Sequence, residues 1–294
     1  MAVYKRAYRS YTGPITAERW RFLVLTRYSL SQLFSSRAFS WFMMVTLLPV
    51  ILSAAYVYVT NSVTAQLVLR MGNQSLLSVD GTFFSKILIA QAWMALFLTC
   101  WAGPLLVASD LSNSALPLYL SRPLNRAEYV TGKAAVLVLI LSCVTWIPVL
   151  LIFALQSSLA GGSWAWQHLS FVAAILAGSF VWIAVLTLMS LATSAWVKWR
   201  IVATAVTFGL FVLPPGFGEA INGVMRTSWG RVLNLPYLLE MILTHMLGAP
   251  MQSHGPFSDQ PLPQFAAWVV LVGVCFASLA LLNKRLRACE VVRG

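Results

Sequence analysis

Residues 134–156 read AAVLVLILSCVTWIPVLLIFALQ, without an Asp, Glu, Lys, Arg or His. A helix needs roughly 20 apolar residues to cross about 30 Å of hydrocarbon, so this stretch alone predicts a transmembrane helix. Five further runs have the same character and predict five more spans: Ala38–Val59, Ile87–Ser109, Leu169–Val197, a run starting at Ile201, and Phe265–Leu282. We therefore predict an all-α polytopic membrane protein with six transmembrane helices.

The composition of the whole chain agrees with this class. Of 294 residues, 59% are hydrophobic and 10% charged, and the mean hydropathy is +0.78. An ordinary soluble domain carries about 25% charged residues, and a nucleic-acid binder with a net charge of +12 would carry more. The expected surroundings are a lipid membrane, with no nucleic acid as partner.

The basic residues predict the orientation. Residues 1–37 have no apolar core of the kind that a signal peptide needs, so the amino terminus should stay in the cytoplasm, and six spans return the carboxyl terminus there. Only Arg70, Lys86, Arg226 and Arg231 then lie outside, and the other 16 of the 20 Lys and Arg residues lie inside. This asymmetry is typical of the positive-inside rule, and we expect a multi-pass protein of a bacterial plasma (inner) membrane.

The spans divide the chain into three parts. Residues 1–37 form a cytoplasmic segment, residues 38–283 the six-helix domain, and residues 284–294 a cytoplasmic tail. Inside the domain we expect an outer loop over 61–86, a turn at Gly161–Gly162, a cytoplasmic loop over 110–133 and an outer segment over 226–264.

The segment 17–36 has the pattern of an amphipathic surface helix. On a helix, Trp20, Leu23, Val24, Leu30 and Phe34 share one side, and Arg19, Arg27, Ser31 and Ser35 lie on others. Such a helix would lie on the anionic inner leaflet. A basic segment that only sets the topology is the alternative.

The predicted spans lack the groups that several functions need. Proton-coupled carriers, voltage sensors and intramembrane hydrolases require ionisable side chains at membrane depth, and the apolar runs contain none. The chain also has no ATP-binding P-loop, because its one Gly-Lys pair, Gly132–Lys133, is followed by Ala134 instead of Ser or Thr. It is not expected to be an enzyme, and a transporter of this kind would take its energy from another subunit.

Residues 109–133 read SDLSNSALPLYLSRPLNRAEYVTGK and predict a structured loop. Ser114 can cap a short helix that has Pro117 in its first turn and ends at Arg122, the residue before Pro123. Asn125 and Glu128 have capping-box spacing for the start of the third span. The short helix is apolar and suits insertion into a groove on a partner.

This loop resembles that of the permease subunits of type-2 ABC transporters, which are six-span exporter permeases. The resemblance rests on Leu116–Leu124, Tyr129 and Gly132–Lys133. It implies a coupling helix that docks on a separate ATPase subunit, a second permease copy in a homo- or heterodimer, and ATP and Mg²⁺ bound by the ATPase, with no cofactor in this chain. The implied coupling residues are Asp110, Leu116, Leu118, Tyr119, Leu120, Arg122, Arg126 and Glu128. The alternative is a membrane-anchor subunit of an assembly or signalling complex that transports nothing.

The fifth apolar run meets Pro214–Pro215–Gly216, where it either kinks and continues toward Met225 or stops as a broken helix or re-entrant turn. The resemblance implies that spans two and five border the pathway at the dimer interface, which is apolar enough for lipids, peptides or drugs. The implied lining candidates are Gln91, Thr99, Thr204, Thr207, Pro214, Pro215 and Glu219. Alternatively, the Gln and Thr side chains hydrogen-bond to neighbouring helices.

The outer segment contains thioether and imidazole groups that suit Cu(I), at Met241, His245, Met246, Met251 and His254. Their spacing is loose. The apolar residues between 235 and 247 more simply predict an amphipathic helix at the outer membrane interface, which we favour over a metal site.

Overall fold

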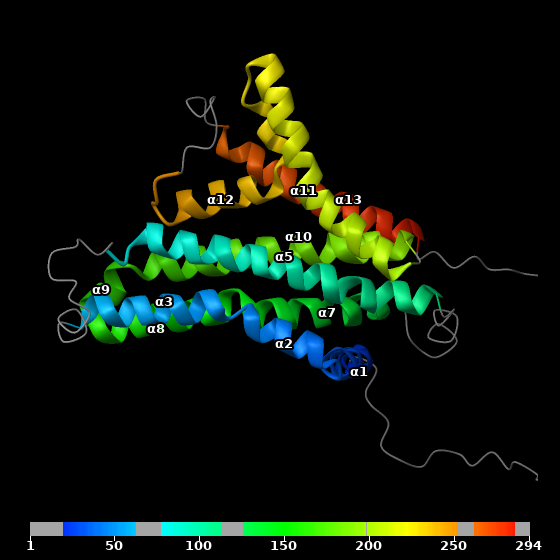
Figure 1. Cartoon of the computed structure of the whole chain (residues 1–294), viewed down its shortest axis with the longest axis horizontal. Coiled ribbons are helices and arrows are strands. Elements are labelled where there is room, and N and C mark those ends of the chain that lie inside the picture. Colours follow the sequence, from blue (N-terminus) through cyan, green and yellow to red (C-terminus); the bar gives the residue numbers. More distant parts are fainter. Residues whose placement is uncertain (1–19, 63–77, 113–125, 198, 252–261, 286–294) are drawn as a thin grey trace, which may run out of the picture.

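The computed structural model describes residues 20–62, 78–112, 126–197, 199–251 and 262–285, and every regular element in these ranges is helical (Figure 1). The α-helices are α1 (Arg21–Phe34), α2 (Arg37–Val45), α3 (Leu48–Asn61), α5 (Gly81–Ser112), α7 (Arg126–Val144), α8 (Trp146–Ala160), α9 (Gly162–Gln167), α10 (Leu169–Trp196), α11 (Arg200–Met225), α12 (Leu235–Met246) and α13 (Gln264–Arg285); the 3₁₀-helix η2 covers Trp229–Leu233.

The predicted number of spans is confirmed for the described part of the chain. Six helical stretches are long and apolar enough to cross a membrane: Arg37–Asn61, Gly81–Ala108, Ala127–Ala160, Leu169–Trp196, Arg200–Met225 and Gln264–Arg285. The first and third stretches each consist of two consecutive helices, α2–α3 and α7–α8. Pro49 and Pro148 lie in the first turn of α3 and α8, where the N–H that proline lacks is not needed by the helix.

Two predicted boundaries shift, and one open alternative is decided. Helix α5 begins at Gly81 instead of Ile87, because the Asp80 carboxylate accepts hydrogen bonds from the backbone N–H groups of Thr82 and Phe83 (3.0 and 3.3 Å). Lys86 therefore lies on α5 and not in the loop. The turn at Gly161 (φ 95°) leads into the short helix α9. Helix α11 runs without interruption through both prolines to Met225, so it does not stop there as a broken helix.

Helices α5 and α10 form the centre of the bundle. Their backbones approach closely where Gly103 faces Ser190, whose hydroxyl would overlap a Cβ at Gly103. The Trp182 indole of α10 donates a hydrogen bond to the Ala92 carbonyl of α5 (3.0 Å). Both helices carry many fully buried large side chains, among them Leu96 and Leu98 on α5 and Ile183 and Leu186 on α10.

Helix α12 is the amphipathic helix predicted in the outer segment, but it does not rest on a membrane surface by its apolar face. Leu238, Leu239 and Ile242 are buried, and the helix packs against α5, α10 and α13. A Cβ at Gly178 on α10 would overlap the Leu243 side chain, so the small residue lets α12 approach the bundle.

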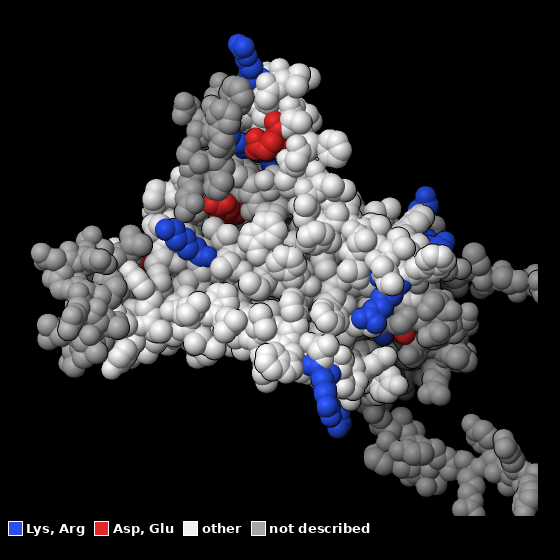
Figure 2. All heavy atoms as spheres, in the orientation of Figure 1, with Lys and Arg blue, Asp and Glu red and all other residues white. Residues whose placement is uncertain are grey.

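Helix α11 leaves the bundle toward its carboxyl end, as the projecting yellow helix in Figure 1 shows. Its exposed residues include Leu213, Phe217, Val224 and Met225. Figure 2 shows mostly uncharged atoms between the groups of charged side chains on this face. We call the end of the bundle that carries α1 the α1 end, and the opposite end the α9 end. The band of uncharged atoms in Figure 2 fits contact with lipid tails or with another subunit.

Candidate functional site

Helix α1 packs against α7 at the end of the bundle where α5 ends and α7 begins (Figure 1). Its buried residues Leu25, Thr26, Ser29 and Leu33 follow a three-to-four-residue spacing and form one stripe, which packs against α7. The apolar face predicted for this helix, which includes Leu23, Val24 and Phe34, stays exposed. The helix therefore has a second, small and partly polar face that holds it to the protein.

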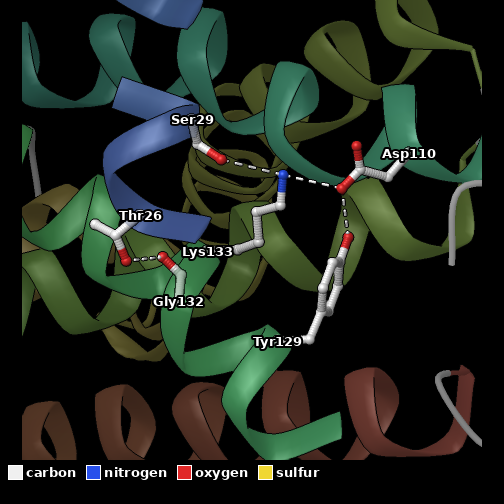
Figure 3. Close-up of polar contacts among 6 residues, drawn as sticks. All are labelled: Thr26, Ser29, Asp110, Tyr129, Gly132 and Lys133. Carbon is white, nitrogen blue, oxygen red and sulfur yellow. Dashed lines mark hydrogen bonds and ion pairs between the residues drawn. The ribbon is translucent and has the colours of Figure 1, made fainter. Parts of the chain in front are cut away.

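Lys133 is the centre of a polar cluster beneath α1 (Figure 3). Its Nζ atom lies 2.9 Å from Oδ2 of Asp110 at the end of α5, and it donates a hydrogen bond to Oγ of Ser29 on α1 (3.3 Å). The Tyr129 hydroxyl on α7 donates to the same carboxylate oxygen (2.9 Å). We call these four residues, Ser29, Asp110, Tyr129 and Lys133, the polar cluster.

The cluster is shielded from water. The Lys133 and Asp110 side chains are 5% and 15% exposed. Burying two charges costs several kcal/mol each, which their attraction offsets only with good geometry and further hydrogen bonds. Ser29 and Tyr129 supply those bonds, and the Lys133 ammonium also lies 5.8 Å from the Tyr129 ring centroid. Removing any one of these partners would leave a buried charge less well compensated.

A backbone contact holds α1 next to the polar cluster. The Thr26 hydroxyl donates to the carbonyl oxygen of Gly132 on α7 (2.9 Å) (Figure 3). A Cβ at Gly132 would lie 3.1 Å from the Phe22 carbonyl oxygen and 3.2 Å from Cδ2 of Leu25. The absence of a side chain at Gly132 thus allows α1 to approach α7 closely enough for the Ser29–Lys133 bond.

The polar cluster joins α1 to the two helices that flank residues 113–125. Helix α5 ends just before this segment and α7 begins just after it, whereas α1 precedes α2 near the start of the chain. Displacement of either helix end would change the cluster contacts with the other end and with α1. The arrangement can therefore transmit movement between the segment 113–125 and three helices.

The predicted coupling residues fall partly in this region. Asp110 is in the polar cluster, and Glu128 is half-buried on the first turn of α7. Arg126 begins α7, and its side chain lies outside the described residues, as do Leu116, Leu118, Tyr119, Leu120 and Arg122. Sequence reasoning did not single out Thr26 and Ser29. The signal in the sequence is that these two small polar residues lie three positions apart on α1. This spacing identifies a helix-packing face only when the position of α7 is known.

Three of the predicted pathway residues are buried inside the subunit. The Gln91 amide is placed to donate to the carbonyls of Val144 and Thr46 (3.1 and 3.2 Å). Thr99 and Thr207 donate to the carbonyls four residues before them, at 2.7 and 2.8 Å. All three have an exposed fraction of 0%. The Gln91 bonds reach neighbouring helices, as the alternative predicts, whereas the bonds to the carbonyls from Thr99 and Thr207 stay within their own helices. The Thr207 hydroxyl also lies 2.8 Å from that of Thr193 on α10.

The other pathway candidates lie at the seam between α5 and α11, which is hollowed at two places. Toward the α9 end, Pro215 and Glu219 line a cavity of about 600 Å³, the Trp93 cavity. Toward the α1 end, Thr204 lines an apolar groove of about 920 Å³, the Trp199 groove. Both volumes fall in the range of small-molecule sites. Pro214 is half-buried beside Pro215 on the same helix.

The Trp93 cavity combines aromatic walls with both signs of charge. Its lining comprises Lys86, Ile89, Ala90, Trp93, Phe211, Val212, Pro215, Glu219, Asn234, Pro236, Tyr237 and Glu240. Behind it, the buried Arg231 approaches Glu219 at 3.8 Å and lies over the Tyr237 ring at 5.6 Å. These contacts fix the projecting end of α11 to the segment that leads into α12.

The described residues contain no group of three His, Cys, Asp or Glu side chains arranged to hold a metal ion. Of the Met and His residues considered for Cu(I), Met241 is buried against the bundle, and His254 lies outside the described residues. Finally, the chain matches no protein-family model, and no curated protein is found to be similar to it.

Proposed function

We propose that this chain is the transmembrane permease subunit of an ATP-driven ABC exporter, working as a dimer with separate ATPase subunits. The observation that carries the proposal is the polar cluster, which ties α1 to the two helix ends that flank residues 113–125. In this proposal, residues 116–122 contact the ATPase, and Asp110 holds the end of α5 in a fixed relation to α7.

Helix α5 would convey the movement to the pathway. It runs from Asp110 in the polar cluster, past Trp101 and Phe97 in the Trp199 groove, to Trp93 and Lys86 in the Trp93 cavity. One helix therefore borders both hollows of the seam with α11. A displacement of its α1 end, driven by ATP binding in the partner, would open one hollow and close the other.

The distribution of charge supports placing the α1 end in the cytoplasm. The described charges at this end include Arg27, Arg37, Arg200, Lys284 and Arg285 against Asp110 and Glu128. On the start of α5, the projecting end of α11, η2 and α12, the basic residues Lys86, Arg226 and Arg231 are matched by Asp80, Glu219 and Glu240. An excess of Lys and Arg is typical of the cytoplasmic face, and it supports a bacterial plasma membrane protein with both termini inside.

A second copy would complete the pathway. The exposed apolar side chains of α11 and the open sides of both seam hollows lie on one helix pair, α5 and α11. Monomeric proteins rarely leave such a continuous apolar face without a partner or a membrane against it. In the proposed dimer, the seam of one subunit faces that of its partner.

Purification of the tagged chain from its native membrane tests the assembly. We expect an ATPase subunit to be recovered with two permease copies, and Leu118→Asp or Tyr119→Asp to release it, because a carboxylate would be buried in an apolar groove. Trp166→Asp on α9 is the matched control, since Trp166 is exposed at the opposite end. Recovery of a complex that has no ATPase, or in which nucleotide turnover responds to no ligand, would favour the membrane-anchor alternative.

A further inference from the structure

Two cavities adjoin at the α1 end and share Trp101 and Arg200. One is the Trp199 groove, whose lining is largely apolar, with Arg200 at its end and Thr204 midway along it. The other is a polar cavity of about 290 Å³ beneath α1, the Ser29 cavity, lined in part by Ser29, Gln32, Ser35 and Ser36. Because Arg200 belongs to both, a molecule with a polar head and an apolar tail could occupy them together.

The charges at this place favour an anion. Among the described residues that line the two cavities, Arg200 is charged and none is Asp or Glu. Arg200 is also the first residue of α11, and Trp199 before it offers no side-chain cap, so the positive end of the helix dipole faces the same region. Serine hydroxyls and the Gln32 amide can donate further hydrogen bonds to a phosphate.

The depth of the site matches one leaflet of a bilayer. The candidate spans containing α2 and α11 begin at Arg37 and Arg200, beside the Ser29 cavity. The groove follows α11 from Trp199 to Phe208, which is about 13 Å at 1.5 Å per residue. This length is about half of the roughly 30 Å hydrocarbon core. The polar cavity thus lies at headgroup level and the groove at the level of the acyl chains.

The walls of the groove are built for an acyl chain. Phe42 stacks on Trp101, and Phe97 stacks on Phe208, with ring centroids 5.5 and 6.0 Å apart. The Thr204 hydroxyl, which is the polar group midway along it, donates to the Cys100 carbonyl (3.0 Å). The groove therefore presents aromatic surface to its occupant and satisfies its own hydroxyl internally.

We propose that the Ser29 cavity and the Trp199 groove bind one anionic phospholipid of the inner leaflet, with its phosphate at Arg200 and an acyl chain against the aromatic walls. Ser29 lines the cavity and also accepts the hydrogen bond from Lys133. Lipid binding therefore changes the surroundings of the polar cluster. The assignment to the inner leaflet rests on the orientation in the proposed function, with the α1 end in the cytoplasm, whereas the lipid binding itself does not depend on an ATPase.

Native mass spectrometry of the purified full chain, titrated with phosphatidylglycerol or phosphatidylcholine, tests the site. We expect one phosphatidylglycerol to bind at least about tenfold more tightly than phosphatidylcholine, and Arg200→Gln to remove this preference, because a charge-assisted hydrogen bond is lost. Lys284→Gln, at an exposed residue near the same end of the bundle, should leave the preference unchanged. Ala205→Trp should weaken the binding of both lipids, because the larger side chain fills the groove.

Circular dichroism and the melting temperature identify any variant that fails to fold. Arg200→Lys keeps the charge and should therefore retain most of the preference for phosphatidylglycerol. An unchanged preference in folded Arg200→Gln would overturn the proposal. Complete displacement of the lipid by an equimolar amount of glycerol 1-phosphate would also overturn it, in favour of a soluble phosphate ligand. A groove that binds neither lipid, and in which Ala205→Trp changes the monomer–dimer ratio, would assign it to a second copy instead.

Discussion

Asp110 on α5 and Lys133 on α7 form a buried ion pair, although an apolar contact would also hold these two helices together. Such pairs often add little net stability, because the cost of removing two charges from water nearly cancels their attraction. Their effect is on the specificity of helix packing. The buried Lys133 ammonium is compensated only when Asp110, Ser29 and Tyr129 all lie close to it. The pair therefore specifies how α1, α5 and α7 are arranged.

Removal of one partner of the pair should destabilise the protein more than removal of both. We expect Asp110→Asn to lower the free energy of unfolding by about 3 kcal/mol, because the buried Lys133 ammonium loses its counter-charge. The double variant Asp110→Asn/Lys133→Met should recover most of that loss. Denaturant unfolding in mild detergent measures both, and losses that simply add in the double variant would contradict the account.

The role of the Asp110–Lys133 pair in coupling to the ATPase can be separated from its effect on stability. In a reconstituted complex with the ATPase, the double variant should fold and assemble, yet ligand-stimulated ATP turnover should fall toward the basal rate. The reason is that a neutral pair no longer fixes α5 to α1. Tyr129→Phe, which removes one hydrogen bond worth about 1 kcal/mol, should reduce the stimulation less. Full stimulation in the double variant would show that the polar cluster has only a structural role.

At the scale of elements, glycines set the distances between helices. At Gly132, a side chain would press on the Phe22 carbonyl and on Leu25 of α1. We expect Gly132→Val to detach α1 and to raise amide hydrogen exchange over residues 21–34, since the Thr26 and Ser29 bonds would break. Gly223→Val on α11 is the control, because a Cβ there meets no neighbour within 4 Å. Equal amide hydrogen exchange over residues 21–34 in both variants would contradict a close contact between Gly132 and α1.

The projecting end of α11 depends on a second close contact. A Cβ at Gly230 would overlap the carbonyl oxygen of Gly218, and the Gly230 N–H donates to Oδ1 of Asn222 (2.8 Å). Gly230→Ala should separate η2 from α11 and expose the link between them to limited proteolysis. Gly216→Ala, on the same helix with open space around it, should leave the cleavage rate unchanged.

The limits of sequence-based prediction follow from the same elements. The six spans could be predicted because each is a long uncharged run, and Asp110 because it ends one of them. The rotation of α5 could not be predicted, since a helix that is apolar on all sides carries no signal of which face meets which neighbour. Gln91 and Thr99 were therefore assigned to a pathway although they face other helices.

The contact between α1 and α7 shows a second limit. Thr26 and Ser29 are 106 and 104 residues away from their partners Gly132 and Lys133. On α1 alone, the predicted apolar face gives the stronger pattern, yet its residues Leu23, Val24 and Phe34 remain exposed. Small polar residues become a packing face only through the partner helix, so the polar cluster required the three-dimensional structure.

At the scale of the whole molecule, the bundle has a compact centre and more exposed helices on two sides (Figure 1). Helices α5, α7, α10 and α12 bury most of the large apolar side chains, whereas α2 and α3 on one side and α11 and α13 on the other leave many exposed. The seam between α5 and α11 lies at the border of the compact centre and contains both the Trp93 cavity and the Trp199 groove. These two hollows are the reason that we place the dimer partner and the pathway at the seam.

The central claim is that ATP in a partner subunit moves α5 and alternates access along this seam. A single cysteine at Ala90 in the Trp93 cavity, introduced after replacement of the four native cysteines, reports access to a water-soluble maleimide in the reconstituted complex with its ATPase. The account predicts that non-hydrolysable ATP raises the labelling rate at Ala90→Cys. A labelling rate that does not respond to the nucleotide would contradict it.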